Sequence, residues 1–218
     1  MIDFLPRPPE GQPLRILCLG AHCDDIEIGC GGTLARFARE WPTAQFHWRV
    51  FSSNPTRKAE TLACANRIMQ AANGRTDVQV LGFRDGFLPY EGYQVKEAFE
   101  ALKAEVKPHL ILTHYRQDLH QDHRLICELT WNTFRNHTVL EYEIPKYDGD
   151  MGIPNVFIPL AKEDVALKTE SLLSCYPSQL GRDWFSEELF KSLMRLRGME
   201  CNAPSGYAEA FHGRKLVI

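Results

Sequence analysis

The sequence predicts an α/β fold, a Rossmann-like open sheet that is mostly parallel and has helices on both faces. Two observations predict it. Apolar runs bounded by turn residues alternate with longer segments of helical period, the pattern of parallel strands joined by crossover helices. Polar clusters directly follow three of these runs, and open α/β sheets bind ligands outside the carboxyl ends of their strands. The 218 residues are predicted to form one domain over residues 1–218.

Four short apolar runs are the predicted strands. The first is LRILCL at residues 14–19, and the second is FHWRVF at residues 46–51. Residues 78–83 and 108–114 form the third and the fourth. Each run has the length of a strand and is bounded by turn residues, which is typical of strands buried in a sheet.

Segments with apolar residues at helical spacing follow these runs. The first predicted helix, residues 31–41, stops before Pro42, because proline cannot continue a helix. Residues 145–159 are rich in proline and glycine and are predicted to be a loop, and long loops of this kind are often functional. The segment after residue 197 is predicted to be irregular. The remaining helices are predicted at residues 57–72, 94–106, 120–135, 161–174 and 186–197.

The composition argues against several classes of protein. The net charge is −3 without a long basic run, so we expect no nucleic-acid partner. The apolar runs are far shorter than the roughly 20 residues of a membrane-spanning helix, so no membrane insertion is expected. The N-terminal stretch MIDFLPRPPEGQP is too polar and proline-rich for a signal peptide. Seven cysteines are spread singly without a CxxC pair, which favours reduced thiols and a cytoplasmic protein.

The polar clusters contain the residue types of a metal site. AHCDDIEIGCGGT follows the first strand, Arg84-Asp85-Gly86 the third, and the segment from His114 to Arg124 the fourth. Imidazole nitrogen and carboxylate oxygen are zinc ligands, and a catalytic zinc takes three protein ligands and leaves one position for water. We expect His22 and Asp25, three residues apart in a turn, to converge on one ion, and His123 to supply the third ligand.

Two neighbouring residues are then free for catalysis. Asp24 is adjacent to a ligand but points elsewhere, so it is expected to act as general base on the bound water. His120 and His123, three apart near a helix start, share one face, so one can bind metal while the other serves the substrate.

Each motif also has a simpler interpretation. The first could be a helix-capping aspartate beside an incidental histidine, and Asp122 could be a first-turn anion favoured by the helix dipole. Each motif alone can occur by chance. It is much less expected that both follow strands of one sheet, and this favours the metal site. His114, at the end of the fourth strand, fits either interpretation.

The glycines of the first cluster do not indicate a nucleotide cofactor. A dinucleotide fingerprint places its first glycine immediately after the strand, whereas Gly29, Gly31 and Gly32 come nine or more residues later, and the P-loop lysine is missing. We expect these glycines to allow close packing of the first helix against the sheet.

The two motifs AHCDDIEIGCGGT and HQDHR together resemble those of the PIG-L/LmbE-like N-acetylglucosaminyl deacetylases, whose pattern is AH-x-DD, GGT and then H-x-DH. The similarity spans most of the chain. Cys23 stands where the family commonly has proline, and Ile26 where glutamate is often found. The resulting segment DIEIG, residues 25–29, resembles the corresponding segment in the branch of the family that contains bacillithiol-type deacetylases. This departure does not identify the substrate. The resemblance includes Arg57-Lys58-Ala59-Glu60, Asp85, Tyr142-Glu143 and Ser178-Gln179.

The resemblance implies a role for each site residue. His22, Asp25 and His123 become ligands of Zn²⁺, with Fe²⁺ also possible in the cell. Asp24 becomes the general base, and His120 stabilises the oxyanion or protonates the leaving amine, oriented by Asp122. The resemblance further implies that sugar hydroxyls contact Arg57 and Asp85, and we predict Tyr142 as a third substrate-binding residue.

The implied reaction is removal of an acetyl group from the nitrogen of an amino sugar or small glycoconjugate, with the attacking water activated by the metal. Cys23 is not needed as a nucleophile in this chemistry. Relatives often form multimers, so a homo-oligomer is possible. Two alternatives stay open: the same metal site used by a hydratase or another C–N hydrolase, and a non-catalytic metal-binding protein.

Overall fold

The computed structural model describes residues 10–216, and all seven of the strands in this part of the chain belong to one sheet. The strand order is β3-β2-β1-β4-β5-β7-β6. The first five strands pair in parallel, whereas β7 is antiparallel to both of its neighbours. The strands are β1 (Arg15–Gly20), β2 (Gln45–Ser52), β3 (Thr76–Phe83), β4 (Leu110–His114), β5 (Thr138–Tyr142), β6 (Val156–Pro159) and β7 (Ala208–Gly213).

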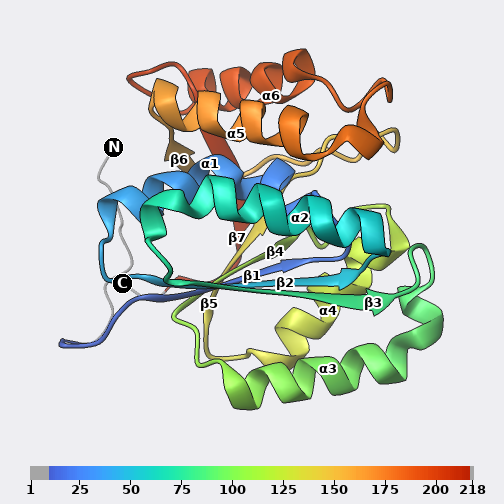
Figure 1. Ribbon diagram of the computed structural model, residues 1–218. Helices are drawn as coiled ribbons and strands as arrows, with labels where there is room; N and C mark the ends of the chain where they lie inside the picture. The colour runs from blue at the N-terminus through green and yellow to red at the C-terminus, as the bar shows by residue number, and fades with distance from the viewer. Residues whose placement is uncertain (1–9, 217–218) are drawn as a thin grey trace.

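Helices cover both faces of the sheet, as predicted. In Figure 1, α1 and α2 lie above the sheet and α3 and α4 below it, while α5 and α6 form a further layer above α1 and α2. The helices are α1 (Asp25–Glu40), α2 (Pro55–Ile68), α3 (Gly92–Glu105), α4 (Gln121–Thr133), α5 (Lys162–Cys175) and α6 (Glu187–Glu200), with short 3-10 helices η1 (Met69–Ala72), η2 (Leu88–Glu91) and η3 (Pro177–Gln179).

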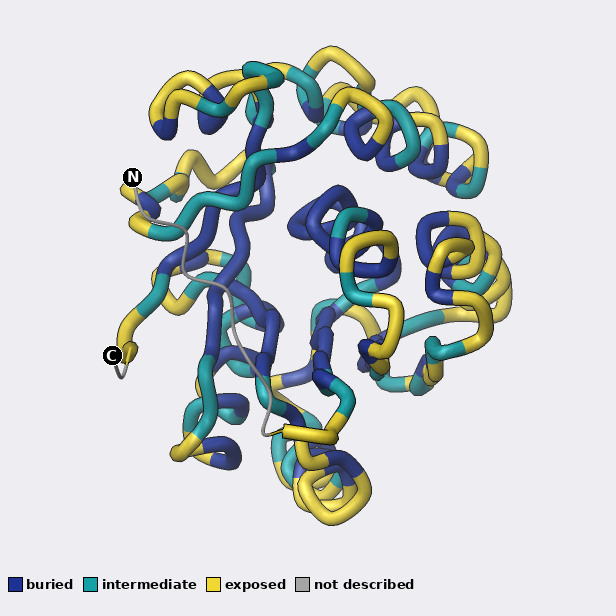
Figure 2. The backbone as a smooth tube through the Cα atoms, turned by 90° about the vertical axis from the view of Figure 1, so that its left-hand side faces the viewer, coloured by how far each residue is buried: buried dark blue, intermediate teal, exposed yellow. Residues whose placement is uncertain are grey.

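The core has one apolar cluster on each side of the sheet. Alternate residues of β1 point to opposite faces, so Ile16 and Cys18 pack in the cluster under α1, and Leu17 and Leu19 pack in the cluster over α3. Figure 2 shows the central strands as buried, whereas the helices expose their outer sides. Burial on both faces explains why the predicted strands are continuous apolar runs rather than alternating ones.

Two strands lie where the sequence predicted loop or irregular chain. β6 lies within the proline- and glycine-rich stretch, and β7 lies in the C-terminal segment predicted to be irregular, so both predictions were wrong over these residues. β5 lies between the helix predicted at 120–135 and the loop predicted at 145–159, and was not predicted. β6 and β7 form an antiparallel pair at the edge of the sheet, between segments about fifty residues apart. Such pairing depends on a distant partner and leaves little local signal.

Helix α1 begins at Asp25 rather than at residue 31, and it is interrupted at Cys30, whose φ of −147° is not helical. The prediction missed the first segment of the helix and found the second. The break leaves backbone groups without helical partners, and two buried side chains replace them. Lys168 Nζ donates to the carbonyl of Ile28 at 2.5 Å, and Glu209 accepts the N–H groups of Gly32 and Thr33 at 3.0 and 2.6 Å.

The close packing expected of the glycines is confirmed at two positions. A Cβ atom on Gly29 would lie 2.2 Å from Cδ2 of Tyr142, and one on Gly32 would lie 2.6 Å from Cδ1 of Leu160. Only glycine therefore allows the first segment of α1 to approach β5 this closely.

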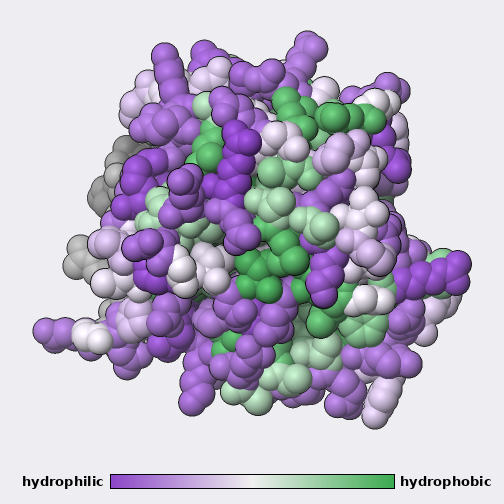
Figure 3. Space-filling view, viewed as in Figure 1, coloured by the Kyte–Doolittle hydropathy of each residue, from purple (hydrophilic) through white to green (hydrophobic). Residues whose placement is uncertain are grey.

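The face of the molecule drawn in Figure 3 is mostly hydrophilic, with smaller hydrophobic areas between the polar side chains. Among the helices of residues 10–216, none combines the length and the apolar character that crossing a membrane requires.

Candidate active site

The predicted site residues meet at the carboxyl ends of β1, β3 and β4. β1 and β4 are neighbours in the sheet, yet the connections from them run in opposite directions, to β2 and to β5. This is the topological switch point, where open α/β sheets form their ligand crevice. The first polar cluster follows β1 and the last follows β4, so residues about one hundred positions apart lie together.

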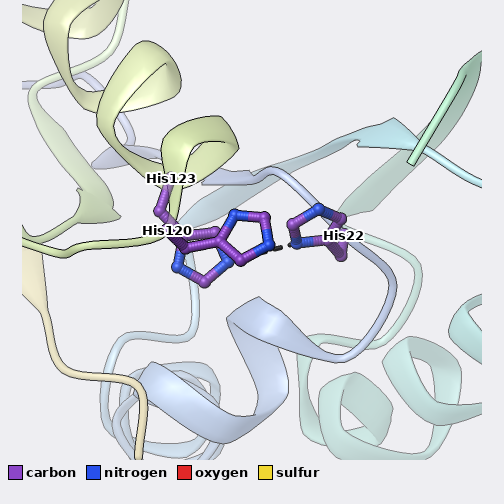
Figure 4. Close-up of side chains that lie close together, drawn as sticks. All are labelled: His22, His120 and His123. Carbon is purple, nitrogen blue, oxygen red and sulfur yellow. Dashed lines mark hydrogen bonds between the residues drawn. The ribbon is translucent and has the colours of Figure 1, made fainter. Parts of the chain in front are cut away.

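The three predicted ligands lie side by side, and Asp25 approaches the two imidazoles with different oxygens. His22 Nδ1 lies 3.1 Å from His123 Nε2 and 3.4 Å from Asp25 Oδ2, and His123 Nε2 lies 3.5 Å from Asp25 Oδ1. Asp25 Oδ2 also accepts the backbone N–H of His22 at 2.6 Å, which closes the turn between β1 and α1. Figure 4 shows His22 facing the histidines at the start of α4.

A carboxylate engages the far nitrogen of each of these imidazoles. His22 Nε2 lies 3.1 Å from Asp122 Oδ2 and 3.2 Å from Asp85 Oδ1. His123 Nδ1 lies 2.9 Å from Asp118 Oδ2. Because a carboxylate only accepts, the ring proton of each neutral histidine is on this far side. In these neutral tautomers the lone pairs of His22 Nδ1 and His123 Nε2 face each other, so the space between them suits a proton or a metal ion.

The charges of the cluster favour a cation in this space. Burial opposes protonation of His22 and His123, but Asp25 and the other carboxylates outweigh it and raise the pKa of both imidazoles. Burial also opposes ionisation of Asp25, yet His123, His114 and His22 outweigh it and hold its pKa well below the usual range. The cluster therefore holds a carboxylate anion and binds positive charge on its imidazole nitrogens.

The spacing of the donor atoms fits a small tetrahedral ion. Two ligands bound at 2.0–2.1 Å to tetrahedral zinc are about 3.4 Å apart. The two imidazole nitrogens are 3.1 Å apart, and Asp25 lies 3.4 Å from one through Oδ2 and 3.5 Å from the other through Oδ1. With one atom per residue, the sets that converge here are His22 with His120 and His123, and Asp25 with His114 and His123. Two imidazoles and one carboxylate are also a donor set that zinc and iron(II) accept.

His114 lies in the same cluster but its geometry does not suit a ligand. It is close enough to Asp25 and His123 to be grouped with them as a potential metal site. However, His114 Nε2 accepts the backbone N–H of Ala21 at 2.9 Å, which occupies the lone pair that would face an ion. Burial and nearby His123 lower the pKa of His114 to about 4, so the ring is neutral. It stacks on His123 with ring centroids 3.9 Å apart and supports that ring.

The Asp24 carboxylate contacts α2, through Arg57. Its backbone is left-handed, with φ of 97° and ψ of −20°, a conformation that costs free energy and is enriched at functional sites. Its Oδ2 lies 2.8 Å from Arg57 Nη2, an ion pair whose geometry is not that of an aligned hydrogen bond. Burial raises the pKa of Asp24 to about 7, and Arg57 limits the rise.

Arg57 is occupied by protein groups. Besides Asp24, its guanidinium donates to the carbonyl of Cys23 and lies 3.4 Å from Glu60 Oε2 and 3.3 Å from Ser178 Oγ. Its side chain is 15% exposed. The resemblance implied that Arg57 contacts sugar hydroxyls, which stays a prediction; the structure shows the guanidinium in contact with the predicted general base.

His120 caps the N-terminus of α4. Its Nδ1 accepts the backbone N–H of Asp122 at 3.2 Å, so the neutral ring has its proton on Nε2. Burial, together with His123 and His22, lowers the pKa of His120. The expectation that the Asp122 carboxylate orients His120 was wrong: only the backbone of Asp122 contacts His120, and its carboxylate contacts His22 and the N–H groups of Gly86 and Leu88.

The two other predicted substrate residues differ sharply in exposure. The side chain of Asp85 is 81% exposed and its Oδ1 lies beside His22, so it is available to a ligand. Tyr142 is fully buried, and its hydroxyl donates to the carbonyl of Leu19 at 2.6 Å. Its ring is packed against Gly29, so Tyr142 supports the fold behind the site rather than facing a substrate.

Sequence reasoning missed Asp118, which is buried in the loop between β4 and α4. It accepts from His123 Nδ1 and from the backbone N–H of His120, at 2.9 and 2.8 Å. A carboxylate within a few residues of a metal-site histidine was the available signal. Cys23 has no role in this arrangement, because burial raises the pKa of its thiol to about 12 and keeps it protonated.

Fold and site together define an α/β protein with a histidine–carboxylate centre at the carboxyl edge of its sheet. The family model described as GlcNAc-PI de-N-acetylase, PIG-L, matches residues 17–134, more than half of the chain, and this region contains His22, Asp24, Asp25, His120 and His123. The chain therefore belongs to the PIG-L family of hydrolytic N-deacetylases, as its motifs predicted.

Solved structures share the fold. A conserved protein of Thermus thermophilus matches with a TM-score of 0.72 and 21% identity, over 94% of this chain and 96% of that chain. The N,N'-diacetylchitobiose deacetylase of Pyrococcus horikoshii matches with a TM-score of 0.72 and 18% identity, over 97% and 87%. The 4-carboxy-2-hydroxymuconate hydratase of Pseudomonas putida matches with a TM-score of 0.75 and 15% identity, over 94% and 98%.

Proposed function

We propose that the protein is a metal-dependent hydrolase that removes the N-acetyl group of an amino sugar or small glycoconjugate. The observation that carries this proposal is the pair of facing nitrogens, His22 Nδ1 and His123 Nε2, 3.1 Å apart beside the Asp25 carboxylate. Neutral imidazoles in this arrangement repel each other unless a cation lies between them, which is a proton in the metal-free site and the metal ion in the proposed enzyme.

We assign His22, Asp25 and His123 as metal ligands, with zinc as the metal and iron(II) as the alternative in the cell. A metal bound there supplies a water of lowered pKa and polarises the amide carbonyl. Asp122 and Asp118 fix the ring orientation of the two histidines, in the manner of carboxylate–histidine pairs around metal sites.

Asp24 and His120 are the proposed catalytic residues. Asp24 takes the proton of the attacking water, and a pKa of about 7 is close to the value at which a general base works best in neutral solution. His120 has its proton on Nε2 and donates it as a hydrogen bond to the oxygen that becomes negative when the amide is attacked. The amine then leaves with a proton, and acetate is the second product.

The substrate class follows from the family and from Asp85. An exposed carboxylate next to His22 is suited to accept hydrogen bonds from sugar hydroxyls. The chitobiose deacetylase of the same fold acts on an N-acetylated sugar, which supports this class. A cytoplasmic location and a homo-oligomer remain predictions from the sequence and the resemblance.

A second candidate is a hydratase that uses the same site, because one solved structure of this fold is a hydratase. The two differ in their products. Chelator-treated protein reloaded with Zn²⁺ or Fe²⁺ is incubated with N-acetylglucosamine and small glycosides of it, and acetate and primary amine are measured. We expect equal amounts of both, and none from His22→Ala. A metal-loaded protein that releases no acetate from any of these substrates would overturn the deacetylase proposal.

A further inference from the structure

The irregular segment between β5 and β6, residues 143–155, is tied to the active-site loop by a buried ionic bridge. Lys146 Nζ lies 3.0 Å from Asp118 Oδ2, and 2.6 and 2.5 Å from the two oxygens of Asp150. Asp150 Oδ2 in turn accepts the backbone N–H of Leu119 at 2.6 Å. We call Lys146, Asp118 and Asp150 the Lys146 bridge.

The bridge is far more enclosed than an ordinary surface ion pair. The side chains of Lys146, Asp118 and Asp150 are 12%, 2% and 6% exposed. Surface pairs contribute little because water screens them, whereas a buried carboxylate that loses its cation is strongly unfavourable. Without Lys146, Asp150 would lose the cation that contacts both of its oxygens, and Asp118 would lose one of the two side-chain partners of its Oδ2.

One oxygen of Asp118 connects the bridge to the proposed metal ligand. Asp118 Oδ2 contacts both Lys146 Nζ, at 3.0 Å, and His123 Nδ1, at 2.9 Å. The other oxygen receives the backbone N–H of His120. The ammonium therefore fixes the position of the oxygen that determines which ring nitrogen of His123 has the proton.

We propose that Lys146 is a positioning residue for His123, acting through Asp118, and that the 143–155 segment is thereby part of the metal site. This rests on the proposed function insofar as His123 is a metal ligand. The ammonium holds Asp118 Oδ2 in place and withdraws electron density from it. His123 consequently keeps its Nδ1 proton and presents Nε2 towards His22 and Asp25.

The first test is a double-mutant cycle read out by metal affinity. Zinc Kd values are measured by chelator competition for the full chain, Lys146→Met, Asp118→Asn and the double variant. Because partners behind metal-bound histidines typically change affinity by 10–100-fold, we expect Lys146→Met to weaken zinc binding roughly tenfold or more. In the Asp118→Asn background the same substitution should change Kd less than about twofold, since residues acting through one partner are not additive.

Lys191→Met is the matched control, because Lys191 also pairs with a carboxylate, Glu187, but on the surface of α6. It should leave the zinc Kd unchanged. Lys146→Met overturns the proposal if it leaves the Kd unchanged. An equal loss of affinity with and without the Asp118→Asn substitution would also overturn it, because that result would show a general loss of stability.

The second test needs neither metal nor substrate. ¹⁵N NMR of the imidazole rings in the metal-free protein, recorded above the raised pKa of His123, reports which nitrogen of the neutral ring is protonated. We expect Nδ1–H in the full chain and a mixture of tautomers in Lys146→Met, while an unchanged ring spectrum would refute the bridge's role. If zinc binds as expected but no acetate is released, the deacetylase proposal fails while the role of Lys146 stands.

Discussion

Asp122 Oδ2 lies 3.1 Å from His22 Nε2, so a carboxylate at the start of α4 orients an imidazole at the end of β1. The same carboxylate accepts N–H groups of Gly86 and Leu88 from the segment after β3. Asp122 thus ties three strand ends together beneath the proposed metal site. A single buried side chain sets both the ring orientation of His22 and the position of the segment that contains Asp85.

The first prediction concerns this contact. Asp122→Asn should weaken zinc binding by about 10–100-fold, the usual effect of losing the partner of a metal-bound histidine. Chelator competition measures it, with Glu128→Gln on the exposed side of α4 as the control. A variant with normal zinc affinity and reduced kcat would instead mean that Asp122 acts on His120.

The second prediction separates the two adjacent aspartates. Asp24→Asn should retain its metal and lose activity by about 10²–10⁴-fold, the range for a general base. Asparagine also tolerates the left-handed backbone at this position, so the turn should keep its shape. Asp25→Asn should lose metal and activity together. Elemental analysis beside kinetics checks both, and loss of metal from Asp24→Asn would show that Asp24 is itself a ligand.

The third prediction is a pH dependence. A general base works when deprotonated, so kcat/KM should fall as the pH drops below the pKa of Asp24, which is about 7 in the metal-free site. A bound cation lowers that pKa, so the acid limb should lie at or below pH 7. Arg57 also lowers it, and Arg57→Met should therefore move the limb to higher pH.

Arg67→Met provides the control for Arg57→Met, because Arg67 lies on the same helix and pairs with Glu170 on the surface. Its pH profile should match that of the unmodified protein. A profile of Arg57→Met with an unmoved limb and a raised KM would assign Arg57 to the substrate instead of to Asp24.

The fourth prediction concerns substrate recognition by Asp85. Asp85→Ala should lower kcat/KM for an N-acetylated sugar by roughly 10- to 100-fold, because a hydrogen bond to a charged group contributes about 1.5–3 kcal/mol. Hydrolysis of a simple acetamide without hydroxyls should be unaffected. Equal losses on both substrates would show that Asp85 supports His22, from which it is 3.2 Å away.

The fifth prediction concerns the interrupted helix. Lys168→Met should lower the free energy of unfolding by about 3–5 kcal/mol, because Glu209 is then a buried charge without its partner. Lys168→Met combined with Glu209→Gln should regain part of that loss, since no charge stays buried and the amide oxygen can still accept a helix N–H group. Urea unfolding measures the difference, and Lys191→Met should leave the midpoint almost unchanged. An unaffected midpoint in Lys168→Met would contradict the assignment of this pair.

Much of the fold could be predicted from local pattern. β1 to β4 and the helices around them were predicted correctly because the side of each element that is buried determines the spacing of its apolar residues, and this spacing can be recognised within the segment itself. β6 and β7 were not, because a short antiparallel edge pair exists only through its distant partner. The first segment of α1 was missed because the break that separates it from the second is completed by Lys168 and Glu209, far along the chain.

The sequence by itself determined the chemical identity of the candidate site: two histidine–aspartate motifs after strands of one parallel sheet, and the family to which they belong. Only the tertiary structure decided which carboxylate contacts which histidine, that Arg57 contacts Asp24, that Tyr142 is buried, and that Lys146 reaches Asp118. The physical reason is that spacing along the chain fixes which donor groups reach a strand end. Their partners are chosen by side-chain packing between segments distant in sequence, as with His22 and Asp122, one hundred residues apart.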